Sequence, residues 1–256
     1  MSTYTIIDRQ DEGSRILADK IRETLNSAGY REDTGVPDTV FVVGGDGTFL
    51  YAVHQYLEHL DHVRFYGIHT GTLGFFTDYR ESELDAFLAA FLEGDVKESV
   101  YPLLQISDGR NLMYGLNEVR VENMTKTQVI DVYINGTFFE TFRGTGLLVS
   151  TQLGSTAYSR SLGGAVIEEG LDVIQLCEVA GIHHIKYRSL GSPVILHGTA
   201  VIELRSGNYE GAVIGADSSV LSLNDTEVLT IRMSDRKVRM LKGRDVSYFH
   251  RLQSLF

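Results

Sequence analysis

The run Thr39-Val-Phe-Val-Val-Gly-Gly-Asp-Gly-Thr48 joins an apolar segment to a glycine-rich loop. Its first five residues are β-branched or aromatic, which is typical of a parallel strand buried on both faces. Three glycines in four residues then allow a tight turn and a close approach of the backbone to a ligand. The pattern from Thr48 to Leu60 is helical, and threonine is a good helix cap. The run therefore predicts a strand, a phosphate-binding loop and a helix N-terminus in succession.

Segments around this run alternate between strand and helix patterns. We expect strands at residues 4–7 and 63–68. We expect one helix from Ser14, a candidate cap, with an apolar face of Ile16, Leu17, Ile21 and Leu25. A second helix is expected over residues 84–92, where leucine and phenylalanine recur at amphipathic spacing. The alternation predicts an open, mostly parallel α/β sheet over residues 1–100.

The pattern changes after Tyr101-Pro102. Short apolar runs at close spacing predict strands, and Asp108-Gly109 and Asn135-Gly136 lie between such runs as hairpin turns. One helix-like segment, Thr156 to Glu169, interrupts them. These features predict a second, β-rich and sandwich-like domain. Its expected strands cover residues 103–106, 112–121, 129–134, 137–142, 194–196, 200–204, 212–214 and 228–233.

The chain has 256 residues and a formal net charge of −11. That acidic balance would repel nucleic acid and anionic membranes, so neither is an expected partner. Phosphate ligands remain compatible because backbone N–H groups and helix termini can hold them locally. The single cysteine, Cys177, excludes an intrachain disulfide and fits a reducing compartment. With no signal-peptide pattern and no apolar run of about 20 residues, we expect a soluble cytoplasmic protein.

Asp46 is the informative residue of the glycine-rich loop, in which Gly44, Gly45 and Thr48 are the expected phosphate-loop residues. A carboxylate should be repelled by a bound phosphate. Its presence is explained if it accepts a proton from an attacking hydroxyl group or holds a cation. The alternative is a plain strand-to-helix turn, since aspartate is a turn former. The chain has no Gly-Lys-Ser/Thr and no Gly-x-Gly-x-x-Gly sequence, so a Walker loop and a Rossmann fingerprint are both excluded.

The segment Gly67 to Phe76 follows the next expected strand. Ligands of open α/β sheets collect beyond the carboxyl ends of strands, so we expect this segment beside the glycine-rich loop. Phe75 and Phe76 could form an aromatic wall for a flat base, or they could be ordinary core residues.

Asn117-Glu118 interrupts the otherwise apolar run Tyr114 to Val121, which has a strand pattern. At least one of the two polar side chains would then point inward and need a partner. Ribose hydroxyls and an ordinary side-chain network would serve equally well.

The segment Leu153 to Gly164 is rich in glycine and hydroxyl side chains. It can donate hydrogen bonds to a sugar or an amide at a helix start. A well-capped surface helix would use the same residue types. The eight histidines, with one cysteine, do not have the spacing of a structural zinc site, so no protein metal ligands are predicted.

These segments, in this order, resemble the NAD kinase family, and most closely the compact enzymes of Gram-positive bacteria. The Gly-Gly-Asp-Gly-Thr sequence alone also has near relatives in lipid kinases and phosphofructokinases. Its combination with Asn117-Glu118 and with Ser155 to Tyr158 is specific. The resemblance extends over most of the chain and includes Val43 to Leu50, Gly67 to Phe76, Leu116 to Glu118, Gly154 to Ser159 and Ala180 to Pro193.

The resemblance implies an α/β nucleotide-binding domain of residues 1–100, to which a tail of about residues 237–256 returns, and a β-rich dinucleotide-binding domain of residues 101–236. It implies transfer of a phosphoryl group from ATP, or from inorganic polyphosphate, to the 2′-hydroxyl of the adenosine ribose of NAD, giving NADP. A divalent cation, usually Mg²⁺, would accompany the nucleotide. Relatives are commonly homotetramers.

The resemblance also implies roles for individual residues. Asp46 would be the base that takes the hydroxyl proton, Gly47 would approach the substrate, and Phe75 would pack near the adenine. Asn117 and Glu118 would hold ribose hydroxyls. The other residues implied to line or adjoin the dinucleotide site are Thr156, Ala157, Tyr158, Ser159, Ser161, Ala180 and Tyr187.

Two positions depart from the family pattern. Arg143 matches a basic family position just before a Gly-x-Gly turn, and Thr145 lies between the two glycines of that turn. Relatives commonly carry an acid at this position that contacts ligand, often from a neighbouring subunit. Thr145 has a hydroxyl and no charge, so that charged contact is not carried over. Gln152 stands where relatives usually have proline, which predicts a small change in loop path and no change in reaction.

Two other functions share parts of the pattern. A lipid or sugar kinase could carry the same glycine-rich loop, although the acidic composition and the lack of an amphipathic basic or aromatic face disfavour a lipid substrate. A non-catalytic NAD(P) sensor could keep the nucleotide site without the chemistry. The intact Asp46 disfavours the sensor.

Overall fold

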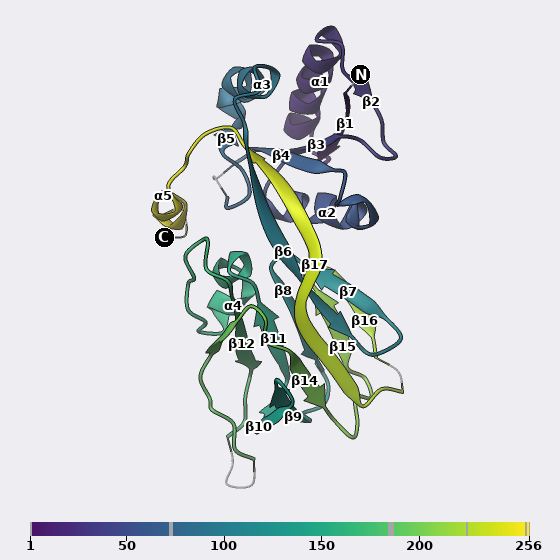
Figure 1. The fold of residues 1–256 in the computed structure, drawn as a ribbon, viewed down its shortest axis with the longest axis vertical. Coiled ribbons are helices and arrows are strands. Elements are labelled where there is room, and N and C mark those ends of the chain that lie inside the picture. The colour runs from purple at the N-terminus through teal and green to yellow at the C-terminus, as the bar shows by residue number, and fades with distance from the viewer. Residues whose placement is uncertain (1, 72–73, 184–186, 224, 254, 256) are drawn as a thin grey trace. The chain divides into compact units, whose positions relative to one another are not determined.

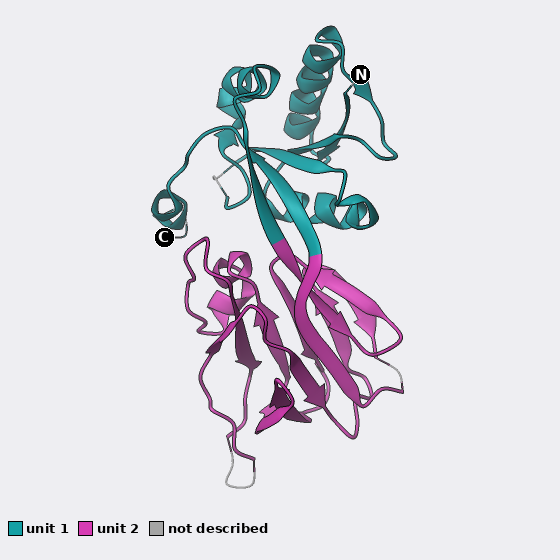
Figure 2. Ribbon diagram, in the orientation of Figure 1, with its two compact units in different colours: residues 1–101, 236–256 teal, residues 102–235 magenta. Residues whose placement is uncertain are grey.

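The computed structural model describes residues 2–71, 74–183, 187–223, 225–253 and 255. The chain forms two compact units (Figure 2), unit 1 with residues 1–101 and 236–256 and unit 2 with residues 102–235. The chain passes between them in two strands, β6 (Lys97–Ser107) and β17 (Val228–Lys242). Unit 2 is therefore an insertion in the chain of unit 1.

Unit 1 contains a parallel sheet in the order β2-β1-β3-β4. β4 also pairs in parallel with β5 and with the end of β17. Every residue of β3 is buried, because helices cover both faces of the sheet. The expected open, mostly parallel sheet is thus confirmed. Its strands are β1 (Thr3–Asp8), β2 (Arg31–Glu32), β3 (Thr39–Val43), β4 (Arg64–His69) and β5 (Tyr79–Arg80).

The helices α1 (Glu12–Ser27) and α3 (Leu84–Leu92) pack on one face of this sheet (Figure 1), in a core that includes Phe41 of β3. The helix α2 (Asp46–Gln55) packs on the other face, where Phe49 lies 5.9 Å from Phe65, centroid to centroid. Phe65 pairs with Val40, whose side chain points away from that of Phe41. Three short segments complete the unit: η1 (Leu57–His59), η2 (Glu81–Glu83) and α5 (Tyr248–Gln253). Within the described chain, the helices fall short of the length and apolarity that a membrane crossing demands.

Both expected caps in unit 1 are wrong. Asp11 is the N-cap of α1, and its side chain accepts the Ser14 N–H at 2.9 Å. The helix consequently starts earlier, and Ile16 is 53% exposed instead of part of the apolar face. Gly45 is the N-cap of α2, which places Thr48 inside the first turn. In both cases an acidic or glycine residue upstream already satisfies the geometry of a helix start.

Unit 2 contains two antiparallel sheets that share one core, as in a sandwich. One has the order β10-β9-β14-β17, with β6 and β7 paired beside β17, and the other has the order β13-β12-β11-β8-β15-β16. Val132 and Leu204 of the first sheet and Val119 and Val149 of the second belong to the same core. The strands are β7 (Leu112–Gly115), β8 (Glu118–Glu122), β9 (Gln128–Ile134), β10 (Thr137–Gly144), β11 (Gly146–Ser150), β12 (Val173–Val179), β13 (Val194–His197), β14 (Ile202–Arg205), β15 (Val213–Ala216) and β16 (Ser219–Ser222).

Local patterns predicted unit 2 unevenly. Asn135 and Gly136 have φ values of 51° and 77°, so the expected hairpin turn is confirmed. The expected helix Thr156 to Glu169 is wrong, because only η3 (Leu153–Thr156) and the single turn α4 (Tyr158–Ser161) are helical. The expected strand over residues 112–121 is in fact two strands that break at Leu116-Asn117.

Candidate active site

The glycine-rich loop leads from the carboxyl end of β3 into α2. Gly45 is extended, and the helix begins at Asp46. The first N–H groups of a helix have no partners within it and carry its positive dipole end, so this loop can accept an anion. Gly44 has no substitute here, because an added Cβ would lie 2.4 Å from the Thr48 hydroxyl oxygen. Gly47 is exposed at the start of the helix.

The Asp46 carboxylate is held by the loop that follows β4. The Phe75 N–H donates to Oδ1 and Oδ2 at 3.1 and 3.0 Å, and the Phe76 N–H donates to Oδ1 at 3.2 Å. An added Cβ at Gly74 would lie 2.2 Å from Oδ1, so only glycine permits this approach. A carboxylate has about four acceptor positions, which leaves Oδ2 able to accept a hydroxyl. The two loops are therefore neighbours, as expected, although Thr72 and Leu73 lie outside the described residues.

His69, at the end of β4, lies beside the same loop and was not anticipated from the sequence. Its Nδ1 is 3.3 Å from Thr77 Oγ1, and an added Cβ at Gly45 would lie 3.4 Å from its Cε1. Burial lowers the pKa of His69 below its ordinary value, while the Asp46 carboxylate acts in the opposite direction. The His69 imidazole beside the glycine-rich loop is therefore neutral at neutral pH.

Arg251 of α5 anchors the loop that holds Asp46. Its buried guanidinium donates to the carbonyl oxygens of Gly74 and Thr77 and pairs with the buried carboxylate of Asp78. A buried charge pair is tolerated only when further hydrogen bonds satisfy both groups, and here the Gly243 N–H also donates to Asp78 at 3.1 Å. No local sequence signal marks Arg251, because its partners lie more than 170 residues away.

The two adjacent phenylalanines have different environments. Phe76 is buried and stacks on Phe49 with ring centroids 5.2 Å apart, so it is a core residue. Phe75 is half-buried, with its ring centroid 6.3 Å from that of Tyr248. Of the pair, Phe75 is the one with a ring surface available to a ligand.

In unit 2, Asn117-Glu118 lies at the junction of β7 and β8. The Asp217 carboxylate accepts the N–H groups of Leu116, Asn117 and Glu118 at 2.8, 2.8 and 3.3 Å. The Thr151 hydroxyl donates to the Leu116 carbonyl at 2.7 Å. These side chains replace the strand ladder at this point, which is why the continuous strand was predicted wrongly.

The turn leaves two side-chain oxygens without partners. Asn117 Oδ1 and Glu118 Oε2 are buried, and neither has a hydrogen-bond partner among the described residues. Such atoms cost free energy unless a ligand satisfies them. Burial, followed by the nearby Asp217 carboxylate, raises the pKa of Glu118 to about 7, with Arg120 opposing and Glu122 reinforcing the shift. Glu118 therefore changes its protonation near neutral pH.

Arg120 and Glu122 extend the polar surface along β8, because alternate residues of a strand share a face. Arg120 Nε donates to Glu122 Oε2 at 2.8 Å, and Tyr158 donates its hydroxyl proton to Glu122 Oε1 at 2.9 Å. Burial, followed by that hydrogen bond, raises the pKa of Tyr158. Sequence reasoning missed Arg120 and Glu122. Their period-two spacing with Glu118 was the signal that would have identified them.

The hydroxyl-rich segment divides into surface and interior residues. An added Cβ at Gly154 would lie 1.9 Å from the Asn117 carbonyl oxygen, so the segment packs directly against the turn. Ser159 is fully buried, and its hydroxyl oxygen accepts from Gln175 Nε2 at 2.7 Å. The structure thus gives Ser159 an interior, structural position. The other expected residues of the segment are half-buried or exposed: Thr156, Ala157, Tyr158 and Ser161.

A further group gathers where β10 and β11 approach the end of β12. The Arg143 guanidinium lies 5.3 Å from the centroid of the Tyr187 ring, a cation–π contact. The Thr145 N–H donates to the Val179 carbonyl at 3.0 Å, and the next residue, Ala180, is exposed with a φ of 47°. The structure therefore brings Arg143, Thr145, Ala180 and Tyr187 together.

Strand register relates the groups of unit 2 to one another. Glu118 pairs across the sheet with Ser150, and Glu122 pairs with Gly146, next to Thr145. Glu118 and Glu122 are four residues apart along β8, so the two cross-strand pairs lie about 13 Å from each other. One face of unit 2 thus carries polar groups at a spacing that suits an extended ligand.

The described residues offer no complete metal cage. No three His, Cys, Asp or Glu side chains are arranged to hold a metal ion in the part of the chain that the structure describes. Mg²⁺ in phosphoryl-transfer sites is commonly bound by one or two carboxylates and by substrate phosphates. A cation held mainly by substrate phosphates fits the residues present, because the N-terminus of α2 can bind those phosphates.

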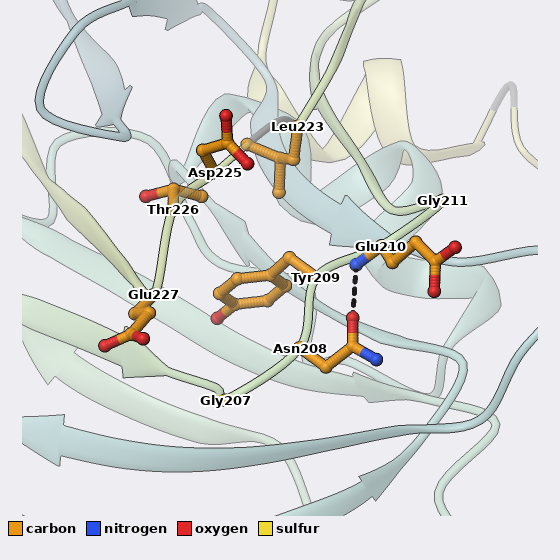
Figure 3. A pocket seen from close by; sticks show the side chains of 9 residues that line it. All are labelled: Gly207, Asn208, Tyr209, Glu210, Gly211, Leu223, Asp225, Thr226 and Glu227. Atoms are coloured by element: carbon orange, nitrogen blue, oxygen red, sulfur yellow. Dashed lines mark hydrogen bonds between the residues drawn. The ribbon is translucent and has the colours of Figure 1, made fainter.

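A hollow of about 540 Å³ lies elsewhere in unit 2 (Figure 3), and residues 207–211, 223 and 225–227 line it. Its described lining includes the acidic side chains of Glu210, Asp225 and Glu227. Those charges oppose a phosphate ligand. None of the expected site residues lines this hollow, and it is not the candidate active site.

Comparison with known proteins covers nearly the whole chain. Residues 7–96 match the family model described as ATP-NAD kinase N-terminal domain, and residues 116–243 match ATP-NAD kinase C-terminal domain. A protein named NAD kinase from Latilactobacillus sakei subsp. sakei is 36% identical over 98% of this chain and 96% of its own. NAD kinase 1 of Bacillus anthracis is 36% identical over 99% of this chain and 98% of its own.

Two solved structures share the fold. The structure of yeast NADH kinase complexed with NADH aligns with a TM-score of 0.84 at 15% identity, covering 99% of this chain and 86% of the other. An NAD kinase from Archaeoglobus fulgidus in complex with ATP aligns with a TM-score of 0.78 at 22% identity, covering 99% of both chains. At these identities the likeness concerns the fold, and it confirms the expected two-domain architecture.

The raised pKa of Glu118 links folding stability to pH. The folded state binds this proton more tightly than the unfolded chain, so the contribution to stability is complete below pH 4.5 and is lost as the pH rises to about 7. The free energy of unfolding of the wild type, minus that of Glu118→Gln, should fall by up to about 3 kcal/mol over this range. Urea unfolding at a series of pH values measures the difference.

The matched control is Glu93→Gln, since Glu93 is an exposed glutamate of unit 1. Its stability should run parallel to that of the wild type at every pH. A difference between wild type and Glu118→Gln that stays constant from pH 4 to 8 would contradict the raised pKa.

Proposed function

This chain belongs to the NAD kinase family, and we propose that it phosphorylates NAD with ATP as the phosphoryl donor. The acceptor is the 2′-hydroxyl of the adenosine ribose, and the product is NADP. The observation that carries this proposal is the Asp46 carboxylate, fixed at the N-terminus of α2 within a glycine-rich loop. A fixed carboxylate beside an anion-binding helix end is what a base for hydroxyl attack on a phosphoryl group requires.

In the proposed reaction Asp46 accepts the proton of the attacking hydroxyl. The ribose oxygen forms a bond to the γ-phosphorus of ATP, the bond from that phosphorus to the bridging oxygen breaks, and ADP leaves. The loop of Gly44, Gly45 and Gly47 and the first N–H groups of α2 bind phosphoryl oxygens, with Thr48 in the first helical turn. A divalent cation such as Mg²⁺, bound together with the phosphates, would neutralise part of their negative charge.

We propose that the polar groups of unit 2 bind the dinucleotide. Asn117 and Glu118 accept from ribose hydroxyls, because their buried oxygens have no partner among the described residues. Tyr158 and Arg143 contribute polar and aromatic contacts along the same face, and Phe75 of unit 1 packs near the adenine. Ser159 acts through its buried hydrogen bond and not through substrate. The remaining proposed contacts are Thr156, Ala157, Ser161, Thr145, Ala180 and Tyr187.

We propose that Asp46→Asn retains NAD binding and loses most turnover. The amide keeps an acceptor for the Phe75 N–H but cannot take up the hydroxyl proton, so kcat should fall by roughly 10²–10⁴-fold. Steady-state NADP formation and isothermal titration with NAD measure the two properties. Asp61→Asn, at an exposed aspartate of the same unit, is the matched control and should keep wild-type turnover. Undiminished turnover in Asp46→Asn would show that Asp46 is not the base.

We expect Gly74→Ala to act through the same carboxylate without changing it. The new Cβ would lie 2.2 Å from Asp46 Oδ1, so the carboxylate or the loop must move. Relief of that contact requires a shift of about 1 Å at the proposed base, which costs on the order of 100-fold in kcat. Gly207→Ala, where no atom lies within 4 Å of the added Cβ, is the control. Equal kcat values for Gly74→Ala and Gly207→Ala would show that turnover does not depend on the close approach of Gly74 to Asp46.

Substrate choice distinguishes the proposal from its rivals. Incubation with labelled ATP and Mg²⁺ should label NAD and leave diacylglycerol and free sugars unlabelled. Label in lipid or sugar alone would establish the rival kinase, and NAD binding without any label would establish a sensor. Replacing ATP by inorganic polyphosphate, with NADP as the readout, tests whether the second donor is also used.

A further inference from the structure

Asp217 is a buried residue in the turn between β15 and β16. Its φ of 49° lies in the left-handed region, which aspartate tolerates better than most residues. Oδ2 accepts the Leu116 N–H at 2.8 Å, and Oδ1 accepts those of Asn117 and Glu118 at 2.8 and 3.3 Å. The Asp217 N–H donates back to the Glu118 carbonyl at 3.0 Å. One residue, about 100 positions away in sequence, therefore holds every backbone donor of this turn.

The carbonyl groups of the same turn are held from the other direction. The Thr151 N–H donates to the Asn117 carbonyl at 2.9 Å, and the Thr151 hydroxyl donates to the Leu116 carbonyl at 2.7 Å. Gly154 packs so closely on Asn117 that a Cβ would lie 1.9 Å from its carbonyl oxygen. The backbone of the turn is thus fixed on both sides, and Asn117 Oδ1 and Glu118 Oε2 are the acceptors left over.

Asp217 also belongs to the charges that face Glu118. Arg120 and Glu122 face it along β8, with Arg120 Nη1 4.0 Å from Glu118 Oε1. Tyr158 faces it from α4, since the Glu118 carboxyl contributes to the raised pKa of that phenol. Among these groups Asp217 and Glu122 oppose ionisation of Glu118, and Arg120 favours it. Removal of the Asp217 charge should consequently make Glu118 easier to ionise.

Given the function proposed above, we propose that Asp217 is a positioning residue: it holds the turn that presents Asn117 and Glu118 to the ribose hydroxyls of NAD without touching NAD itself. Two consequences follow from one side chain. Its hydrogen bonds place the two acceptors, and its charge sets the pH at which Glu118 becomes the carboxylate that accepts from hydroxyl groups.

The test is NAD binding by the full chain as a function of pH, measured by calorimetry without a phosphoryl donor so that no turnover occurs. The wild type should bind NAD more tightly as the pH rises through about 7, because Glu118 then ionises. Asp217→Asn should bind NAD at least roughly tenfold more weakly at high pH, since its amide cannot accept from all three N–H groups. The midpoint of its pH dependence should move to lower pH.

Asp217→Glu separates position from charge and serves if Asp217→Asn does not fold. It keeps the negative charge on a longer side chain, so the midpoint should stay near that of the wild type while the affinity falls. Asp225→Asn is the matched control, since Asp225 is an exposed aspartate with the same φ of 49°, and it should behave as wild type.

Wild-type affinity in Asp217→Asn or Asp217→Glu would overturn the proposal. A weaker affinity in Asp217→Asn with an unmoved midpoint would also overturn it, because that result indicates a purely structural role. Failure of the proposed function has a different signature, namely wild-type protein that forms no NADP from NAD, ATP and Mg²⁺. NAD binding by the wild type is sufficient for the Asp217 experiment, so its outcome does not depend on whether NADP is formed.

Discussion

The candidate-site loops of each unit depend on backbone approaches that leave no room for a Cβ atom. In unit 1 the space at Gly74 admits the Asp46 carboxylate, and in unit 2 the space at Gly154 admits the Asn117 carbonyl. Each approach brings a polar group out of water and against a neighbouring loop, where its hydrogen bonds are stronger than in solvent. Within each unit the strands bring the loops together, and these close contacts determine where the Asp46 carboxylate and the Asn117 carbonyl lie.

Local sequence patterns were sufficient to predict the fold class. Every residue of β3 is buried, as its unbroken apolar run predicted, and α3 has the bounds that its leucine and phenylalanine spacing indicated. The Asn135-Gly136 turn has the two positive φ values that its composition favours. The resemblance to NAD kinases rested on short motifs in a fixed order, and the family comparisons over residues 7–96 and 116–243 confirm it. Hydrophobic periodicity and turn composition are properties of neighbouring residues, and each family motif is itself a short run of sequence.

The features that the sequence did not reveal are contacts between distant segments. Asp217 acts on residues about 100 positions earlier, and Arg251 acts on a loop more than 170 positions earlier. The strand pattern of residues 114–121 was misleading for the same reason, because Asp217 and Thr151 take the hydrogen bonds that a ladder would have used. The wrong caps at Ser14 and Thr48 have a smaller cause. Neighbouring residues competed for one helix start, and Asp11 and Gly45 lie earlier in the chain.

The insertion of unit 2 into the chain of unit 1 fixes an order of events during translation. Unit 2 is one continuous stretch, and all of it has been synthesised before the second half of β17 and α5 are made. The Gly74 to Phe76 loop receives its anchor from Arg251 only then, and the Asp46 carboxylate is held by that loop. Domains fold as their chain becomes available, so unit 2 can fold before the Arg251 anchor of this loop has been made. A nascent chain that extends just past residue 235 therefore contains all of unit 2 and still lacks Arg251, the anchor of the loop that holds Asp46.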